Sequence, residues 1–364
     1  MHLHHPAHLR PAAGTRRPAG PQRLTPRARR SSPAPPPNQN LECPTVTVTT
    51  HAPPAAGVAF DIIDRALREV PEYQAFRSGR LSRADYCSWL HSGALTASAA
   101  GLTEDQLHLS TRFPADERGF TEQVLHTLHE DGLIGSVAYP EAEFDALRDR
   151  VAAGFAHEGR TTYIFPEEAR LLFALGHILA PRRAVFPGSY YGYWAVWAIP
   201  GIRAAGGTAT LVDIDPGTMA LAARNLEALG LADGVEFATT DAIAFGTTLE
   251  PVDLCVLDAE GPAPQHAPKG TDPDLVDKAI YYPIMAATTP ALRPGGLLIA
   301  HNMLLENLTD NRYFAGRIAN NRAQYARFQE HLDAHYDSQH LVPSSEGTGI
   351  YRRNPGATVR EAAR

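Results

Sequence analysis

The sequence predicts an α/β protein built on a doubly wound, mainly parallel sheet, which follows a helical region and a proline-rich tail. Two observations predict this fold class. From about Tyr163 onward, short apolar strands alternate with helices, and their continuous apolar runs are typical of strands buried on both faces. The hydrophobic fraction of 44% is sufficient for a buried core and too high for a disordered chain.

Residues 1–56 are expected to form a disordered tail. They hold 12 of the 30 prolines and seven arginines against one acid, Glu42, which gives this segment a charge of +6. Proline restricts the backbone and removes hydrogen-bond donors, and no apolar periodicity accompanies it. A basic arm for acidic partners and a transit peptide are the alternatives. The remainder of the chain carries −13, which argues against a nucleic-acid partner.

Residues 57–158 are expected to form a helical cap domain, a bundle of four or five helices. An amphipathic run over 61–70 ends at Pro71, and Ser82 with Asp85 suits the start of another helix. Two further apolar faces at helical spacing cover 120–128 and 144–155.

Residues 159–353 are expected to form the sheet domain, and 354–364 a second disordered tail. Five parallel strands are predicted at Ala184–Phe186, Thr208–Val212, Val235–Ala238, Asp253–Leu257 and Gly296–Ala300. A last pair, at His340–Val342 and Gly349–Arg352, suits an antiparallel edge and brings the sheet to seven strands. Helices are predicted at Pro166–Ile178, Trp194–Ile202, Pro216–Leu229, Pro273–Thr289 and Asn311–His331.

Ligands of such sheets bind at the carboxyl ends of the strands, so the loops that follow the strands are the candidate site. Gly188 and Gly192 follow the first strand and let the backbone approach a ligand closely. Asp213 ends the second strand, where an acid can accept hydrogen bonds from both hydroxyls of a ribose. Asp215 before Pro216 suits a helix N-cap, and Asp241 after the third strand suits one less well.

The order of these motifs resembles the class I methyltransferases that use S-adenosylmethionine, and more narrowly their catechol and caffeoyl-CoA O-methyltransferase branch. The similar stretches are Phe165–Glu168, Gly188–Gly192, Val212–Pro216, Ala223–Leu226, Val256–Ala259, Leu292–Gly296 and Gly347–Arg353. The resemblance implies a Rossmann-like domain that binds S-adenosylmethionine. It implies that Gly188 and Gly192 lie near the methionine moiety, that Asp213 binds the ribose, and that Asp241 and Ala242 lie at the adenine.

The chain departs from that branch at four places. Phe186 stands where an acid is expected before the glycine loop, and His301–Asn302 stands where an Asp–Asn pair is expected. The lysine expected a few residues after Asp258 is missing, and a polar insertion precedes Lys278. The glycine loop is also unusually aromatic. A divalent metal is therefore doubtful, with Asp258, His301 and Asn302 only weak candidate ligands.

The predicted catalytic residues are His301, Tyr191 and Asp258. His301 follows a strand and could act as a general base, bind a metal, or do neither. Asp258 is expected to line the site, where it either binds a metal or polarises the substrate, and it is also a predicted cofactor contact. Tyr190 and Tyr191 lie in the loop that should face the cofactor, where an aromatic face can hold the sulfonium, whereas Trp194 and Trp197 begin a helix and could only pack its base against the sheet.

The resemblance favours methyl transfer to a small molecule, in secondary metabolism such as antibiotic biosynthesis. The departures suit a second reaction of S-adenosylmethionine, its cyclisation to azetidine-2-carboxylate with release of methylthioadenosine, or the transfer of its 3-amino-3-carboxypropyl group. An inactive cofactor-binding regulator is the third alternative. Partners other than the small molecule are not expected, neither nucleic acid nor membrane, although the family suggests a homodimer. Three distant cysteines favour the cytoplasm.

Overall fold

The computed structural model describes residues 56–305 and 311–359, and all bounds given below refer to this part of the chain. The predicted N-terminal tail, up to residue 55, lies outside the described residues, as do 360–364 of the predicted C-terminal tail. The described residues from 56 onward belong to a single compact unit. None of the described helices is both long and apolar enough to span a membrane.

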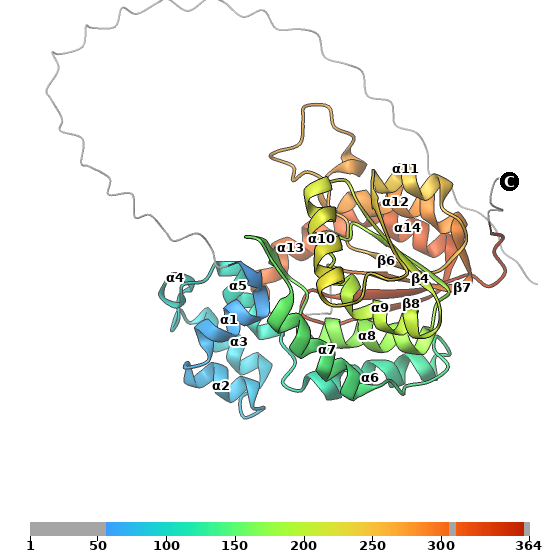
Figure 1. The fold of residues 1–364 in the computed structure, drawn as a ribbon. Coiled ribbons are helices and arrows are strands. Elements are labelled where there is room, and N and C mark those ends of the chain that lie inside the picture. Colours follow the sequence, from blue (N-terminus) through green and yellow to red (C-terminus); the bar gives the residue numbers. More distant parts are fainter. Residues whose placement is uncertain (1–55, 306–310, 360–364) are drawn as a thin grey trace, which may run out of the picture. The chain divides into compact units, whose positions relative to one another are not determined.

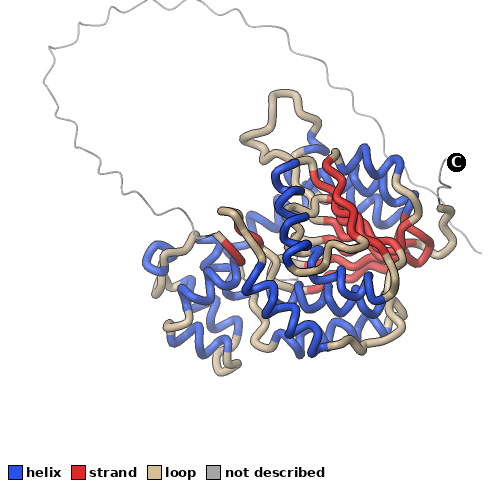
Figure 2. The backbone as a smooth tube through the Cα atoms, viewed as in Figure 1, coloured by secondary structure: helices blue, strands red, loops and turns tan. Residues whose placement is uncertain are grey.

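A seven-stranded sheet forms the middle layer of this unit (Figure 2). Its strands lie in the order β5-β4-β3-β6-β7-β9-β8, and the first five are parallel. Strand β9 pairs antiparallel with both β7 and β8. The strands are β3 Arg183–Pro187, β4 Thr208–Asp213, β5 Val235–Thr239, β6 Val252–Leu257, β7 Leu292–Ala300, β8 Tyr336–Val342 and β9 Thr348–Arg353. The predicted fold class, with its antiparallel edge, is confirmed.

Helices cover both faces of the sheet, because each strand directs alternate apolar side chains to opposite sides. Phe186 and Leu211 join one core, whereas Val185 and Val212 join the other. Figure 1 shows α8 and α9 on one side and α11, α12 and α14 on the other. These helices are α8 Pro166–Leu179, α9 Ala195–Ala204, α10 Pro216–Ala228, α11 Ala242–Thr248, α12 Tyr281–Thr288, α13 Ala315–Gln324 and α14 Ala326–His335.

Seven described α-helices precede α8, and they fall into two groups. The first five share an apolar core that contains Ile63, Tyr86 and Leu107. The last two contribute Leu125 and Phe144 to the core beside α8 instead of completing a separate bundle. The helices are α1 Ala59–Leu67, α2 Pro71–Arg77, α3 Arg83–His91, α4 Ala97–Ala100, α5 Glu104–Leu109, α6 Glu117–Glu130 and α7 Glu141–Gly154.

Two local features differ from the sequence-based prediction. Strand β1 (Gly57–Val58) pairs in parallel with β2 (Thr161–Thr162), and two-residue strands are too short to show an alternating pattern. The helix predicted from Pro273 begins only at Tyr281, after two short 3₁₀ turns. Asp277 adopts a φ of 49°, a left-handed conformation that an α-helix cannot continue through.

Candidate active site

A cavity of about 750 Å³ lies at the carboxyl ends of β3, β4, β6 and β7, where the fold class places a ligand. Gly188 and Tyr190 line it from the glycine loop, and Asp213 lines it from β4. Its other wall comes from the β2 segment and from polar side chains after β6 and β7, namely Asp258, Glu260, Lys278, His301 and Asn302. This volume is in the usual range for small-molecule sites.

Position 188 requires glycine, both because of its backbone conformation and because of its close neighbours. Its φ is 71°, and a Cβ added to it would lie 2.3 Å from the Cα of Ala259. Its N–H donates to the carbonyl oxygen of Val212 at 2.9 Å, which holds the loop against β4. Gly192 has a φ of 83° but faces Ala222 of α10 rather than the cavity. Of the two predicted glycines, the structure therefore brings only Gly188 to the cavity.

The two loop tyrosines have different surroundings. Tyr190 lines the cavity, has 42% of its surface exposed, and adopts a left-handed φ of 48°. Tyr191 is fully buried, and its hydroxyl lies 2.9 Å from Nδ1 of His157, beneath the loop. Tyr190 therefore faces the cavity and Tyr191 packs beneath the loop, and the predicted contact of each with the cofactor stays a prediction.

Asp213 is held by the backbone of the loops around it. Its Oδ2 accepts a hydrogen bond from the N–H of Tyr190 at 3.0 Å, and its Oδ1 accepts one from the N–H of Asp215 at 3.1 Å. Burial raises the pKa of this carboxyl above its usual value, against the lowering effect of these hydrogen bonds. Each oxygen retains a lone pair that can accept from a ligand hydroxyl. Ile214, 71% exposed, offers an apolar surface beside it.

The two other acids that were predicted at this edge of the sheet are helix N-caps. Asp215 accepts from the N–H of Thr218 at 2.6 Å and begins α10, as expected. Asp241 accepts from the N–H of Ala244 at 2.8 Å and begins α11. Neither Asp241 nor Ala242 is among the residues that line the cavity. Their predicted contact with the adenine stays a prediction.

A chain of four alternating charges runs from the cavity into the interior. Nζ of Lys278 lies 3.3 Å from Oδ1 of Asp258, whose Oδ2 lies 3.4 Å from Nδ1 of His301. Nε2 of His301 lies 3.1 Å from Oε2 of Glu168, a carboxylate that is fully buried at the start of α8. Charges that are buried in this way are tolerated only when each is paired.

This chain of charges fixes the protonation of its members. Burial alone would lower the pKa of His301, but the carboxylates of Glu168 and Asp258 raise it to about 10. Burial acts to raise the pKa of Asp258 and of Glu168, but the charge of His301 and the hydrogen bonds that each carboxylate accepts, together with the charge of Lys278 at Asp258, lower the pKa in both. At neutral pH His301 is therefore an imidazolium with both nitrogens engaged. A general base must be able to accept a proton, so this pairing favours a fixed positive charge over the general-base alternative for His301, whose role stays a prediction.

Lys278 and Glu168 are the two members of this chain of charges that the sequence-based prediction missed. The insertion between Asp258 and Lys278 is closed at its base by hydrogen bonds of Gly261 to the carbonyl oxygen of Asp277 (2.9 Å) and of Asp277 to that of Pro262 (3.1 Å). Lys278 thus returns to Asp258 and also donates to the carbonyl oxygen of Ala259 at 3.0 Å. One signal was available, because this arginine-rich chain has only two lysines.

The donor set at Asp258 does not suit a divalent metal. Oδ1 of Asp258 takes the ammonium of Lys278 and the amide of Asn302 (2.9 Å), and Oδ2 faces protonated His301. A metal would have to displace an ammonium and bind beside an imidazolium, whereas hard cations prefer several free oxygen ligands. Within 56–305 and 311–359, no cluster of three His, Cys, Asp or Glu side chains could hold a metal ion. We derive no step through a metal.

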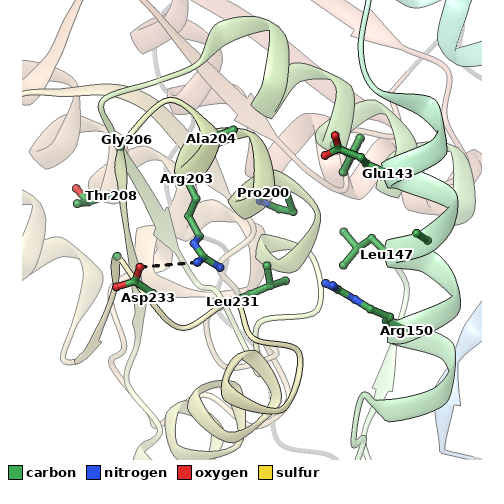
Figure 3. Close-up of a pocket in the computed structure, with 14 residues that line it drawn as sticks. Glu143, Leu147, Arg150, Pro200, Arg203, Ala204, Gly206, Thr208, Leu231 and Asp233 are labelled. Atoms are coloured by element: carbon green, nitrogen blue, oxygen red, sulfur yellow. Dashed lines mark ion pairs between the residues drawn. The ribbon is translucent and has the colours of Figure 1, made fainter.

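A second large cavity, of about 720 Å³, lies at the opposite ends of the strands. It is bordered by α7, the end of α9 and the residues that precede β4 and β5 (Figure 3). Figure 3 shows the side chain of Arg203 directed at Asp233, and their charged atoms lie 3.7 Å apart. No residue of the predicted site lies there, so this cavity is separate from the site at the carboxyl ends.

The structure resembles solved methyltransferases. A methyltransferase from Podospora anserina with bound SAH is 16% identical over 59% of this chain and 89% of its own, with a TM-score of 0.41. An O-methyltransferase from Bacillus cereus in complex with SAH is 17% identical (66% and 100% covered, TM-score 0.42). A caffeoyl-CoA O-methyltransferase candidate from Staphylococcus aureus is 13% identical (64% and 99%, 0.42).

No protein-family model and no curated protein matches the sequence.

Proposed function

We propose that this protein transfers a methyl group from S-adenosylmethionine to a small molecule without a metal ion. One observation carries the proposal: a single cavity joins Gly188 and Asp213, which suit a nucleoside cosubstrate, to the polar cluster of Asp258, Lys278 and Asn302. A nucleoside end and a reactive end in one cavity are what a group transfer from such a cosubstrate requires.

The nucleoside end is built from the loops after β3 and β4. Asp213 offers its remaining lone pairs to the ribose hydroxyls, and the exposed side chain of Ile214 offers an apolar surface to the base. Gly188 lets the methionine portion approach the backbone, because no side chain occupies that position. The exposed aromatic ring of Tyr190 can face a sulfonium, which has no hydrogen-bond donors and is attracted by an aromatic face.

At the reactive end, the chain aligns the acceptor and stabilises the charge that develops on it. Methyl transfer is an in-line displacement at an already activated carbon, so alignment supplies most of what the reaction needs. Two donors of Lys278 go to Asp258 and Ala259, and its ammonium also lies 3.7 Å from Oε2 of Glu260, an exposed partner that an oxygen of the acceptor can replace as the proton of that oxygen leaves. Protonated His301 keeps Asp258 ionised and in place.

A second reaction is favoured by the same protonation state. His301 is charged at neutral pH and so cannot remove a proton from an external acceptor. Cyclisation of S-adenosylmethionine needs no external acceptor: its amine gives up a proton to water and attacks its own Cγ, and the electrons of the broken C–S bond leave with the sulfur of methylthioadenosine. Transfer of the 3-amino-3-carboxypropyl group breaks the same C–S bond.

Product analysis distinguishes these reactions. The purified protein is incubated with S-adenosylmethionine alone and with a panel of small phenols, amines and carboxylic acids, with and without EDTA, and the products are identified by mass spectrometry. We expect S-adenosylhomocysteine only when an acceptor is present, and no effect of EDTA. Methylthioadenosine without an acceptor would replace methyl transfer by cyclisation, and loss of turnover in EDTA would contradict the metal-free site.

A further inference from the structure

The loop between β8 and β9 brings one more carboxylate to the cavity at the sheet edge. Glu346 lies in this loop and lines the cavity, although only 1% of its surface is exposed. Its N–H donates to Oε1 of Glu168 at 3.0 Å, and Oε2 of Glu168 lies beside His301. The N–H of Met303 donates to the carbonyl oxygen of Gly347 at 2.9 Å, so the loop packs against the residues that follow His301. Glu346 therefore belongs to the reactive end of the cavity.

One oxygen of the Glu346 carboxylate has no partner in the protein. Oε2 accepts from Nη2 of Arg317, in the first turn of α13. Oε1 accepts no hydrogen bond from a described residue, and it is not one of the unpartnered polar atoms that lack accessible surface. Buried polar atoms almost always have a partner, so an open oxygen in a cavity wall indicates where a bound molecule would donate.

The other carboxylates that line the cavity are less suited to take a proton from a bound molecule. Both oxygens of Asp258 are engaged by charged or amide neighbours. Asp213 and Asp215 accept from backbone N–H groups at the nucleoside end. Glu260 and Asp105 have 63% and 45% of their side chains exposed, so water competes for their oxygens.

The charges around Glu346 suit a base that works near neutral pH. Burial raises the pKa of its carboxyl above the usual value, against the lowering effect of Arg317 and of protonated His301. The carboxylates of Glu168 and Asp105 add to the rise. A carboxylate with a raised pKa holds a proton more strongly, which brings it closer to the pH at which a general base is most effective.

We propose that Glu346 is the general base of the methyl transfer and that its Oε1 accepts the proton of an acceptor hydroxyl. This inference rests on the function proposed above, and it supplies a proton acceptor in place of His301, both of whose nitrogens are engaged. The hydroxyl proton passes to Oε1, the hydroxyl oxygen forms the bond to the methyl carbon, and the electrons of the broken C–S bond leave with the sulfur of S-adenosylhomocysteine. Lys278 stabilises the negative charge that develops on the oxygen, and Glu346 then releases the proton to water.

Two phenols that differ in ionisation test this role. Phenol keeps its proton at neutral pH, whereas pentafluorophenol is already ionised and needs no base. The full chain and its Glu346→Gln variant are each incubated with S-adenosylmethionine and one of the two probes, and S-adenosylhomocysteine is measured by mass spectrometry. We expect Glu346→Gln to lower kcat with phenol by about 100-fold or more, and to change kcat with pentafluorophenol by no more than about threefold.

Arg317→Gln is the matched variant, because it breaks the same ion pair but keeps the carboxylate. With phenol, kcat/KM of the unaltered chain should fall toward low pH as Glu346 takes up a proton. Arg317 lowers the pKa of Glu346, so its removal should move this fall to higher pH, and Glu346→Gln should lack the fall altogether. A residue that only holds the loop in place would change neither pH profile.

Calorimetric titration with S-adenosylhomocysteine separates a lost base from a lost fold. Both variants should bind it, because neither residue lies at the nucleoside end. Unchanged turnover of phenol by Glu346→Gln, or an equal loss with both probes in a variant that still binds S-adenosylhomocysteine, would overturn the role of Glu346 and leave the methyl transfer intact. No S-adenosylhomocysteine from the unaltered chain with either probe would instead overturn the proposed function, and this role with it.

Discussion

His301 shows how neighbours can reverse the chemistry that a residue type suggests. A histidine at the end of a central strand favours proton transfer near neutral pH. Here Glu168 and Asp258 hold the ring from both sides and keep it charged. Glu168 in turn accepts from the N–H of Phe165 and of Glu346, so its carboxylate cannot turn away. These contacts suit a fixed cation that orients Asp258.

Glu168→Gln tests this pairing through the pH dependence of stability. The pKa of His301 is raised from 6.5 to about 10, so its pairing stabilises the fold fully below about pH 6.5 and is lost as the pH rises toward 10. We expect the variant to lower the free energy of unfolding by about 3–5 kcal/mol at pH 6.5. Denaturant titrations from pH 6.5 to 10 should show this difference shrinking.

Glu158→Gln is the matched control for that measurement. Glu158 forms an exposed ion pair with Arg224 at 2.8 Å, with about half of each side chain accessible to solvent. Such pairs contribute less than about 1 kcal/mol, so the loss should be small and independent of pH over this range. A Glu168→Gln difference that stays constant to pH 10 would mean that His301 is neutral in the folded protein.

Residue types and strand ends predicted part of the site, but not which side chains reach it. Asp213 is the last residue of a strand, and Asp258 and His301 each come directly after one. They could be predicted because the carboxyl ends of parallel strands meet at one edge of the sheet. Tyr190 and Tyr191 are adjacent in one loop, so only the left-handed turn at Tyr190 determines which one faces the cavity. Lys278 is brought back by backbone hydrogen bonds across an insertion, which no local pattern encodes.

At the scale of elements, α8 and α9 position the site by unusually close packing. A Cβ on Gly201 would lie 2.3 Å from the backbone of Gly176, and one on Gly176 would lie 2.6 Å from the carbonyl oxygen of Ala198. Glycine on both helices therefore allows backbone contact. Helix α8 carries Glu168 at its start, and α9 follows the glycine loop, so this contact sets the distance between the two halves of the site.

Gly201→Ala should therefore be destabilising, with a loss of at least about 2 kcal/mol in the free energy of unfolding because the backbones must separate. Gly316→Ala in α13 is the matched control: its Cβ would meet open space, and alanine should add up to about 1 kcal/mol. Urea titrations of both variants measure the two changes. Equal effects would contradict close packing of α8 on α9.

Elements were predicted best where burial dominates the sequence pattern. The continuous apolar strands β3, β4 and β6 lie within one or two residues of their predicted bounds, because both faces are covered by helices. The helix predicted from Pro273 is shorter than expected, because a single left-handed residue, Asp277, interrupts it. Conformations of that kind are set by tertiary contacts and have no periodic signature.

At the scale of the whole unit, Arg112 connects the first helices to the sheet edge. It is 1% exposed and donates from Nε to the carbonyl oxygen of Ser345 at 2.6 Å, and from Nη2 to that of Ser344 at 2.5 Å. The same loop is held from the other side, because Ser345 donates from its N–H to Glu167 at 2.8 Å and Ser344 donates from its hydroxyl to Glu168 at 2.8 Å. Residues distant in sequence thus share one buried network.

Arg112→Leu should destabilise the fold, because it removes the buried contact between the first helices and the loop that contains Ser344 and Ser345. Two charge-assisted hydrogen bonds are lost and two carbonyl groups lose their partner, so we expect a loss of about 3–5 kcal/mol. Arg148→Leu, at an exposed ion pair of α7, should cost less than about 1 kcal/mol. Calorimetric melting should show one transition for the unaltered chain. Equal melting temperatures for the two variants would contradict a connecting role for Arg112.

The measurement that tests the proposed function most directly is calorimetric titration with S-adenosylhomocysteine, which needs no knowledge of the acceptor. We expect micromolar binding by the full chain and a loss of about tenfold or more in Asp213→Ala, because the hydrogen bonds to the ribose hydroxyls are removed. Asp233→Ala, at the opposite ends of the strands, should bind as the unaltered chain does. No binding by the unaltered chain, or equal affinity in Asp213→Ala, would contradict a nucleoside cosubstrate at this edge of the sheet.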